Sequence, residues 1–139
     1  MTTLTAQKKF QYAQISTILE HPEVMIVEAT GTYIPTEDFK IIFNYIAESL
    51  KGKKFKKLIF DKRKLSVFNQ SSMEWYFSEW KDKVYELGLT THRKILPDNK
   101  VFIQSVAIGR ENIAKKFPSG KFLKMDIQYS KSLEDAIAV

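Results

Sequence analysis

The spacing of apolar side chains along this chain changes from a strand period to a helix period and back several times. Residues 10–19 and 24–29 are rich in β-branched and aromatic side chains and predict two strands. A His-Pro-Glu turn at residues 21–23 separates them, so we expect an antiparallel hairpin. Residues 1–9 precede the first predicted strand and form a candidate disordered segment.

Two amphipathic helices follow the hairpin. The first begins near Thr36, a suitable N-cap residue, and stops before Gly52. The second begins at Ser71, which stands three residues before Glu74 as in a capping box, and stops before Gly88. The apolar residues of each helix share one face at helical spacing: Phe39, Ile42, Phe43, Ile46 and Leu50 in the first, and Met73, Phe77, Trp80, Val84 and Leu87 in the second.

Between the two helices, residues 58–60 form a continuous apolar run without alternation. Such a run is typical of a strand that is buried on both faces, at the centre of a parallel sheet. The strand and the two helical stripes should therefore cover one another. The predicted core residues are Phe39, Ile42, Phe43, Ile46, Leu58, Ile59, Phe60, Phe77, Trp80 and Val84.

The C-terminal part of the chain predicts two further strands, residues 93–96 and 122–129, and a last short helix, residues 133–138, capped by Ser132. Residues 100–117 place apolar side chains on one helical face but also have high strand propensity. We favour a helix with a break near Gly109, and a strand followed by a helix is the alternative.

Strands that alternate with helices after an initial hairpin predict an α/β fold. We expect a single domain over residues 1–139. Its N-terminal antiparallel hairpin should lead into a mostly parallel sheet with helices packed on it.

The composition excludes several kinds of chemistry. The chain has no cysteine, and its two histidines lack the spacing of metal ligands, so we expect no disulfide, metal or cofactor. No nucleophile elbow, phosphate loop or dinucleotide fingerprint is present, and we expect no enzymatic activity. No apolar run approaches the length of a transmembrane helix, and the N-terminus does not resemble a signal peptide. These features predict a cytoplasmic protein.

The excess positive charge is concentrated in residues 51–64, which hold eight Lys or Arg and one acid, Asp61. The predicted strand divides this window, because Lys51, Lys53, Lys54, Lys56 and Lys57 precede it and Lys62, Arg63 and Lys64 follow it. The two groups should lie at opposite ends of the sheet, which disfavours a continuous nucleic-acid surface. We therefore regard nucleic acid as an improbable partner.

The order of elements, the LIFD sequence that closes the central strand, the Gly31 turn, the spacing of Trp80 and Gly88 and the SLEDAIA tail resemble the STAS-like superfamily. This superfamily includes bacterial anti-sigma-factor antagonists, and its fold is similar to that of lipid-binding CRAL-TRIO domains. The resemblance implies a regulatory module with a phosphorylatable serine at the start of the helix after the central strand, at Ser71 or Ser72. On the residues alone, both serines are explained first of all as helix caps.

Two further sets of residues are candidate sites. Asp61, Lys62, Arg63 and Lys64 lie at the carboxyl end of a strand, where open α/β sheets bind ligands, and could bind an anion. The alternative is that Asp61 is structural and pairs with Lys62 or Arg63. Trp75 and Tyr76 flank the apolar stripe of the second helix, which predicts a surface for a homodimer or a protein partner. Packing beneath the preceding loop is the alternative for both.

The sequence thus predicts a non-catalytic regulatory or protein-interaction module. The alternative is a carrier or sensor of an anionic or lipid-like small molecule. An enclosed apolar cavity would favour the carrier, whereas a filled core with an exposed aromatic patch would favour the interaction module.

Overall fold

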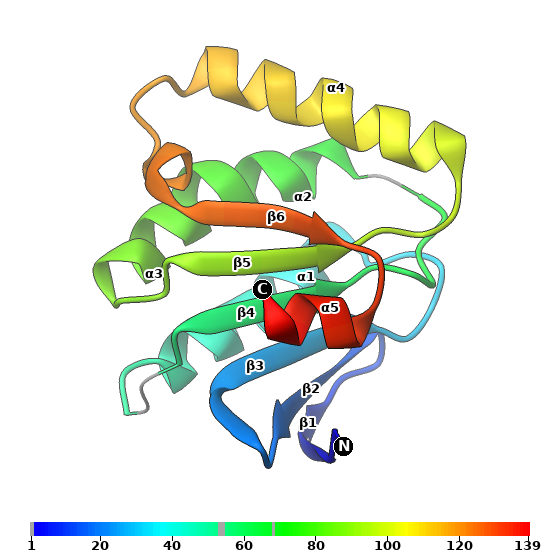
Figure 1. Cartoon of the computed structure of the whole chain (residues 1–139). Helices are drawn as coiled ribbons and strands as arrows, with labels where there is room; N and C mark the ends of the chain where they lie inside the picture. Colours follow the sequence, from blue (N-terminus) through cyan, green and yellow to red (C-terminus); the bar gives the residue numbers. More distant parts are fainter. Residues whose placement is uncertain (1, 53–54, 68) are drawn as a thin grey trace.

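Six strands form one sheet in the computed structural model, which describes residues 2–52, 55–67 and 69–139 (Figure 1). The strands follow one another across the sheet in chain order. The first three pair antiparallel, and the third to the sixth pair parallel, so the predicted α/β class and the mostly parallel sheet are confirmed. The strands are β1 (Leu4–Lys9), β2 (Ala13–Ile18), β3 (His21–Ala29), β4 (Lys57–Asp61), β5 (Thr91–Ile95) and β6 (Asp126–Ser130).

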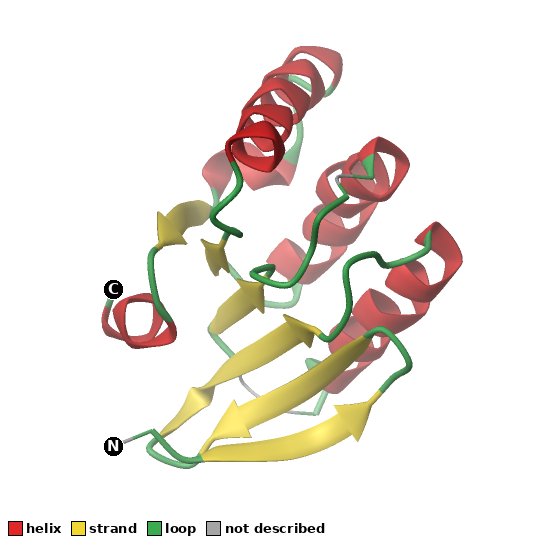
Figure 2. Cartoon of the chain, turned by 90° about the vertical axis from the view of Figure 1, so that its right-hand side faces the viewer, coloured by secondary structure: helices red, strands yellow, loops and turns green. Residues whose placement is uncertain are grey.

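The helices lie on both faces of the sheet, but unequally. Parallel neighbours that follow in chain order are joined by crossovers of one hand, which places their helices on the same face. Accordingly α1, the α2–η1–α3 helix and α4 cover one face, and of the described helices α5 alone covers the other (Figure 2). The helices are α1 (Thr36–Ser49), α2 (Gln70–Trp75), the π-helical η1 (Tyr76–Trp80), α3 (Lys81–Glu86), α4 (Lys100–Lys116), the 3-10 helix η2 (Lys121–Lys124) and α5 (Leu133–Ala138).

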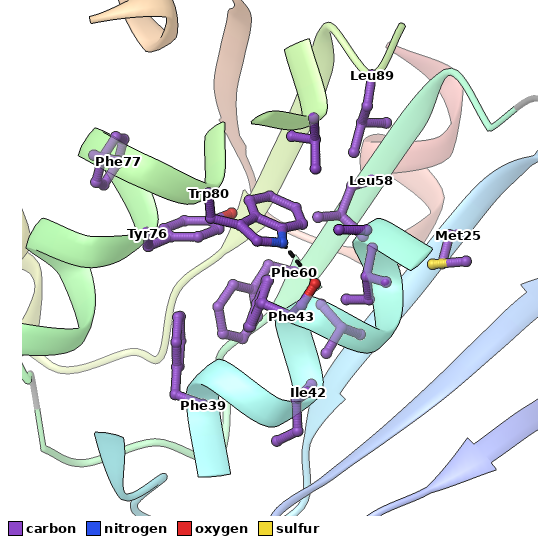
Figure 3. Packing of buried hydrophobic residues seen from close by; sticks show 14 of the residues in the cluster. Met25, Phe39, Ile42, Phe43, Leu58, Phe60, Tyr76, Phe77, Trp80 and Leu89 are labelled. Atoms are coloured by element: carbon purple, nitrogen blue, oxygen red, sulfur yellow. Dashed lines mark hydrogen bonds between the residues drawn. The ribbon is translucent and has the colours of Figure 1, made fainter. Parts of the chain in front are cut away.

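The main core lies on the face of the sheet covered by α1, the α2–η1–α3 helix and α4, and it is rich in aromatic rings (Figure 3). Phe39 and Phe43 stack on one another, and Trp80 donates its indole N–H to the Phe43 carbonyl oxygen at 2.6 Å. All ten predicted core residues are buried. Ile59 differs from the other nine because it points to the opposite face, where it joins a smaller cluster beneath α5.

The N-terminal region differs from the prediction. Residues 4–9 are not disordered, because they form the edge strand β1, which pairs with β2. The prediction missed this strand because β1 is exposed along its whole length and has no apolar alternation. The hairpin turn also lies at residues 19–20, since β3 already begins at His21.

The second helix also differs in its ends and in its interior. Asn69, not Ser71, is the N-cap residue, and its side-chain oxygen accepts a hydrogen bond from the Ser72 amide at 3.2 Å. The π-helical turn in the middle adds a residue to the helical repeat and widens the buried face. The helix ends as predicted before Gly88, which has a positive φ of 99°.

The C-terminal elements settle the open assignment. Residues 100–116 form one helix that continues through Gly109, so the favoured helix is confirmed and the expected break is wrong. A helix tolerates an internal glycine at a cost of about 1 kcal/mol. The first half of the predicted last strand is instead the 3-10 helix η2. Ser132 caps α5 as predicted, by accepting a hydrogen bond from the Asp135 amide at 3.1 Å.

Candidate functional site

Asp61 and Arg63 pair with one another at the end of β4. The Asp61 carboxylate accepts hydrogen bonds from the Arg63 side chain at 2.7 and 3.0 Å and from the Arg63 amide at 3.1 Å. Asp61 is buried, whereas Arg63 and Lys64 are exposed. The structural alternative for Asp61 therefore describes its contacts better than a ligand-binding role.

Lys62 does not join its neighbours in a common anion site. Successive residues of a strand point to opposite faces, and Lys62 follows Leu58 and Phe60 toward the main core. Only 2% of its surface is exposed, and its ammonium nitrogen lies 4.8 Å from the centre of the Phe60 ring. The predicted grouping of residues 61–64 as one site is therefore wrong.

The other end of β4 carries the second part of the basic window. Lys57 donates hydrogen bonds to the carbonyl oxygens of Ala136 and Ile137 at 3.0 and 2.9 Å, at the C-terminal end of α5. It has a structural role there, because a cation is stabilising beside free carbonyl groups of a helix end. Lys53 and Lys54 lie outside the described residues.

The two candidate phosphorylation sites differ in access. Ser72 is buried, and its hydroxyl lies 3.2 Å from the Thr36 hydroxyl, within hydrogen-bond distance. A kinase could not reach this oxygen in the folded chain. Ser71 is exposed in the first turn of α2, and its phosphorylation stays a prediction.

The two aromatic residues predicted to form a contact surface also differ. Tyr76 is fully buried, so the prediction that its side chain points off the buried stripe is wrong. The π-helical turn places it between Phe77 and Trp80, and its ring stacks on Trp80 (Figure 3). Trp75 is half-buried and packs edge-on against Phe39.

The sequence analysis missed a cluster of cations inside the main core. Lys81 and Lys94 are fully buried, and their amines lie on the Phe77 ring, each 4.3 Å from its centre. Arg110 reaches the same ring from α4, at 5.5 Å. Among the described residues, no acidic side chain pairs with Lys62, Lys81 or Lys94, and the amines of Lys81 and Lys94 have no hydrogen-bond partner other than one another. We call Lys62, Lys81 and Lys94 the buried lysine cluster.

Burial has a large effect on these groups, because a charge is poorly solvated in an apolar core. It lowers the pKa of Lys62 to about 7, with a further contribution from the positive charge of Arg110. Burial, then the charges of Arg110 and Lys62, hold the pKa of Lys81 well below its usual range. The pKa of Lys94 is lowered in the same way by burial and then by Lys81, Lys62 and Arg110.

Two local features bring these lysines inside. The π-helical turn ends at Trp80 and rotates Lys81 toward the sheet. On β5, three consecutive polar residues, His92, Arg93 and Lys94, occupy a strand that is covered on both faces. Burial and the nearby lysine charges also keep the pKa of His92 well below its usual range. A polar run in a strand expected to be inside the sheet was the available sequence signal, since such strands are normally apolar.

An apolar groove of about 920 Å³ runs between α4 and the edge strand β6, next to this cluster. Arg110 lies in its wall, where its guanidinium donates a hydrogen bond to the Tyr129 hydroxyl at 3.0 Å. The described residues around it are Leu96, Pro97, Asp98, Ile103, Val106, Ala107, Arg110, Glu111, Ala114, Phe122, Leu123, Tyr129, Ser130 and Lys131.

The sequence analysis contrasted an enclosed apolar cavity with a filled core that carries an exposed aromatic patch, and the structure matches neither arrangement fully. Two voids between the helices and the sheet have volumes of about 20 Å³ or less, which leaves no room in them for a ligand. The open apolar space is instead at the edge of the sheet. Because the strands follow in chain order, no reversal of strand order opens a crevice at the sheet centre, where doubly wound sheets bind ligands.

Comparisons with known proteins do not identify a family: no family model matches the chain, and no curated protein or solved structure is significantly similar to it. The STAS-like resemblance therefore stays a prediction. In the described ranges, no three His, Cys, Asp or Glu side chains come together as a metal site. No helix in these ranges is both long and apolar enough to cross a membrane.

Proposed function

We propose that this chain is a non-catalytic binding module, a carrier or sensor, for a small molecule with an apolar tail and an anionic head. The tail would occupy the groove between α4 and β6, and the head would contact Arg110. The observation that carries the proposal is the position of Arg110, which belongs to the groove wall and also contacts the ring that supports the buried lysine cluster.

The size and lining of the groove support a small-molecule ligand. Pockets for such ligands commonly have volumes of about 300–1,000 Å³ and are mostly apolar, with a few polar groups that fix orientation. Ile103 and Ala107 line the α4 side, and Leu123 and Tyr129 line the opposite side. Ile103, Leu123 and Tyr129 each expose more than a third of their surface, which leaves apolar area available to a ligand.

The charges around the groove support an anionic head. Glu111, in the groove lining, pairs with Lys115 at 3.2 Å. The other charged residues of the lining are two cations, Arg110 and Lys131, and one acid, Asp98. The guanidinium of Arg110 has spare donors beyond its hydrogen bond to Tyr129, and it suits carboxylate or phosphate oxygens.

A matched pair of substitutions on α4 tests this function. Ala107→Trp fills the groove, whereas Ile108→Trp places the same bulk on an exposed residue outside the groove lining. In a calorimetric titration with decanoate, we expect Ala107→Trp to weaken binding by about tenfold or more, and Ile108→Trp to change it by less than about twofold. Equal binding by both variants, or no binding of decanoate by the unmodified chain, would contradict the proposal.

A protein-interaction module remains the second candidate, because α4 carries exposed apolar side chains outside the groove. Val101 and Ile108 are 72% and 60% exposed, and they are seven residues apart on one face of the helix. This face could contact a second copy or another protein. If so, Ile108→Glu should lower the association constant in sedimentation experiments, whereas a chain that stays monomeric at high concentration would exclude the second copy.

A further inference from the structure

The buried lysine cluster has no structural explanation among the described residues. A buried amine without a hydrogen-bond partner costs free energy, and a buried charge without a counter-charge costs more. Lys62 lies 3.9 Å from the Met73 sulfur and over the Phe60 ring, and the amines of Lys81 and Lys94 lie on the Phe77 ring and beside one another. Residues that place a polar group in a core without a compensating interaction are commonly functional.

The cluster lies directly behind the groove. Lys62, Lys94 and Arg110 line an internal void that is too narrow for a water molecule. Val106 and Arg110 line both this void and the groove. The Arg110 side chain and the Val106 side chain therefore form the partition between them. Entry of a ligand from the groove would require the Arg110 side chain, which has several rotatable bonds, to move and the void to widen.

We propose that Lys62 and Lys94 form an inner receptor for the oxyanion head of the groove ligand, and that the site takes up a proton when the head enters. This inference rests on the proposed function, because the tail must lie in the groove to bring the head to the partition. The ligand class is a carboxylate or phosphate attached to an apolar tail.

The chemistry follows from the charge balance of the site. Without a ligand the amines are largely neutral above about pH 7, since burial and nearby positive charges disfavour their charged forms. An oxyanion beside an amine favours the ammonium form, so the –NH₂ group takes a proton from solvent and becomes –NH₃⁺. The anion and the proton enter together, and the site gains an ion pair instead of an isolated charge.

Other titratable groups face the same space and must be considered. They come from every element around it: Lys62 from β4, His92 and Lys94 from β5, Tyr76 from η1, Lys81 from α3, Arg110 from α4 and Tyr129 from β6. None of these groups is a carboxylic acid. A tyrosine loses its proton only at high pH, and burial raises the pKa of Tyr76 further. Proton uptake on ligand binding should therefore come from the buried lysines or from His92, and substitution of the lysines distinguishes these sources.

Linkage fixes the direction of the pH dependence. A group whose pKa rises on binding makes the affinity greatest at low pH, and the affinity falls as pH rises between the free and bound pKa values. For Lys62 the fall begins near pH 7. Affinity should decrease by up to about tenfold per pH unit for each proton taken up. A head group that stays on exposed lysines would show no such dependence at neutral pH, because those lysines are already charged.

Calorimetric titration of the full chain with decanoate tests the inference. At pH 8, titrations in Tris and in HEPES at equal ionic strength separate the heat of binding from the heat of proton uptake. We expect an uptake of about one proton with the unmodified chain. We expect Lys94→Met to lose most of this uptake and to bind about tenfold more weakly, and Lys62→Met to act in the same direction. Lys124→Met, which removes an exposed lysine, should match the unmodified chain.

The outcomes separate this inference from the proposed function. Decanol should occupy the groove without proton uptake, and inorganic phosphate should bind weakly because it has no tail. Decanoate that binds without proton uptake, or with the same uptake in Lys94→Met and Lys62→Met, would overturn the inner receptor and leave the groove function intact. Decanoate that does not bind at all would overturn both.

Discussion

Arg93 and Lys94 are neighbours on β5, both are 1% exposed, and they point to opposite faces of the sheet. Arg93 has the contacts expected of a structural cation. It donates to the carbonyl oxygens of His92, Asp126 and Val139 at 3.0, 2.9 and 3.0 Å, and to the Asp126 carboxylate at 2.9 Å. Lys94, one residue later, has neither a carbonyl nor a carboxylate partner among the described residues.

The difference shows how this fold stabilises a buried cation when stability is the only requirement. On the α5 face, a guanidinium holds the end of a helix and the edge strand together through four hydrogen bonds. On the other face, Lys62 lies on the Phe60 ring and Lys81 and Lys94 lie on the Phe77 ring, and no acidic side chain in the described ranges pairs with them. We interpret the first arrangement as structural and the second as a site that is completed by a ligand.

The largest effect that this comparison predicts is for Arg93→Met. The substitution removes all four hydrogen bonds and leaves three carbonyl groups without this donor, so we expect the free energy of unfolding to fall by about 2–4 kcal/mol. The estimate stays below the cost of breaking a fully buried pair, because the Asp126 carboxylate is half exposed and can be solvated. Chemical denaturation measures the change, and an unchanged stability would remove the structural role.

Lys94→Met should have the opposite sign. Methionine fills a similar volume without an amine, and replacing a buried amine that has no carbonyl or carboxylate partner removes the cost of its desolvation. We expect the free energy of unfolding of the empty protein to rise by about 1–3 kcal/mol. A loss of stability of similar size would show that Lys94 is structural, as Arg93 is, and would make the comparison fail.

The pH dependence of stability sharpens the comparison. Lys62 has a pKa of about 7 in the folded chain and a usual value near 10.4 when unfolded. The unfolded chain therefore binds the additional proton between these values, and Lys62 alone should make stability rise with pH by about 1.4 kcal/mol per pH unit in that window. Lys81 and Lys94, whose pKa values are also lowered, should steepen the rise in that window and extend it to lower pH.

Denaturation at pH 7 and pH 9 measures this slope, and Lys62→Met is the variant that should reduce it. Most proteins are most stable between about pH 5 and 8. A free energy of unfolding that is equal at pH 7 and pH 9 would mean that the lysines keep their charge when buried.

The smallest expected effect is for an exposed cation of the same basic window. Lys64 is exposed just after β4, and it lies outside both the groove lining and the buried lysine cluster. Lys64→Met should change the free energy of unfolding by less than about 0.5 kcal/mol and leave its pH dependence unchanged. A larger change would indicate that overall charge, not burial, explains the behaviour of the lysine variants.

Most of the fold could be predicted from the sequence, because its signals are local. The spacing of Phe39, Ile42 and Phe43 indicated the buried face of α1, and residues 58–60 indicated a central strand. Strand β1 could not be predicted in this way, since its exposed residues owe their conformation to pairing with β2. The π-helical turn is equally invisible to a pattern that assumes a constant helical period.

The candidate site was harder to predict. Lys62 was grouped with Arg63 and Lys64 by charge, but the alternation of a strand sends it to the other face. The π-helical turn changes the direction of the side chains that follow its start, and both Tyr76 and Lys81 lie in the core. The groove brings together α4, η2 and β6, and no single sequence segment carries that information. The polar run at residues 92–94 was visible in the sequence, and it indicates the site once β5 is known to lie inside the sheet.

The most direct test of the central claim compares the stability of the unmodified chain and Lys94→Met with and without decanoate. A ligand that binds only the folded state stabilises it in proportion to the logarithm of its concentration over the dissociation constant. We predict that Lys94→Met is the more stable protein without decanoate, and that decanoate, below its micelle-forming concentration, stabilises the unmodified chain more. The difference in free energy of unfolding between the two proteins should then shrink or reverse when decanoate is added. Equal stabilisation of both proteins by decanoate would contradict the claim that the buried lysine cluster exists to receive the ligand.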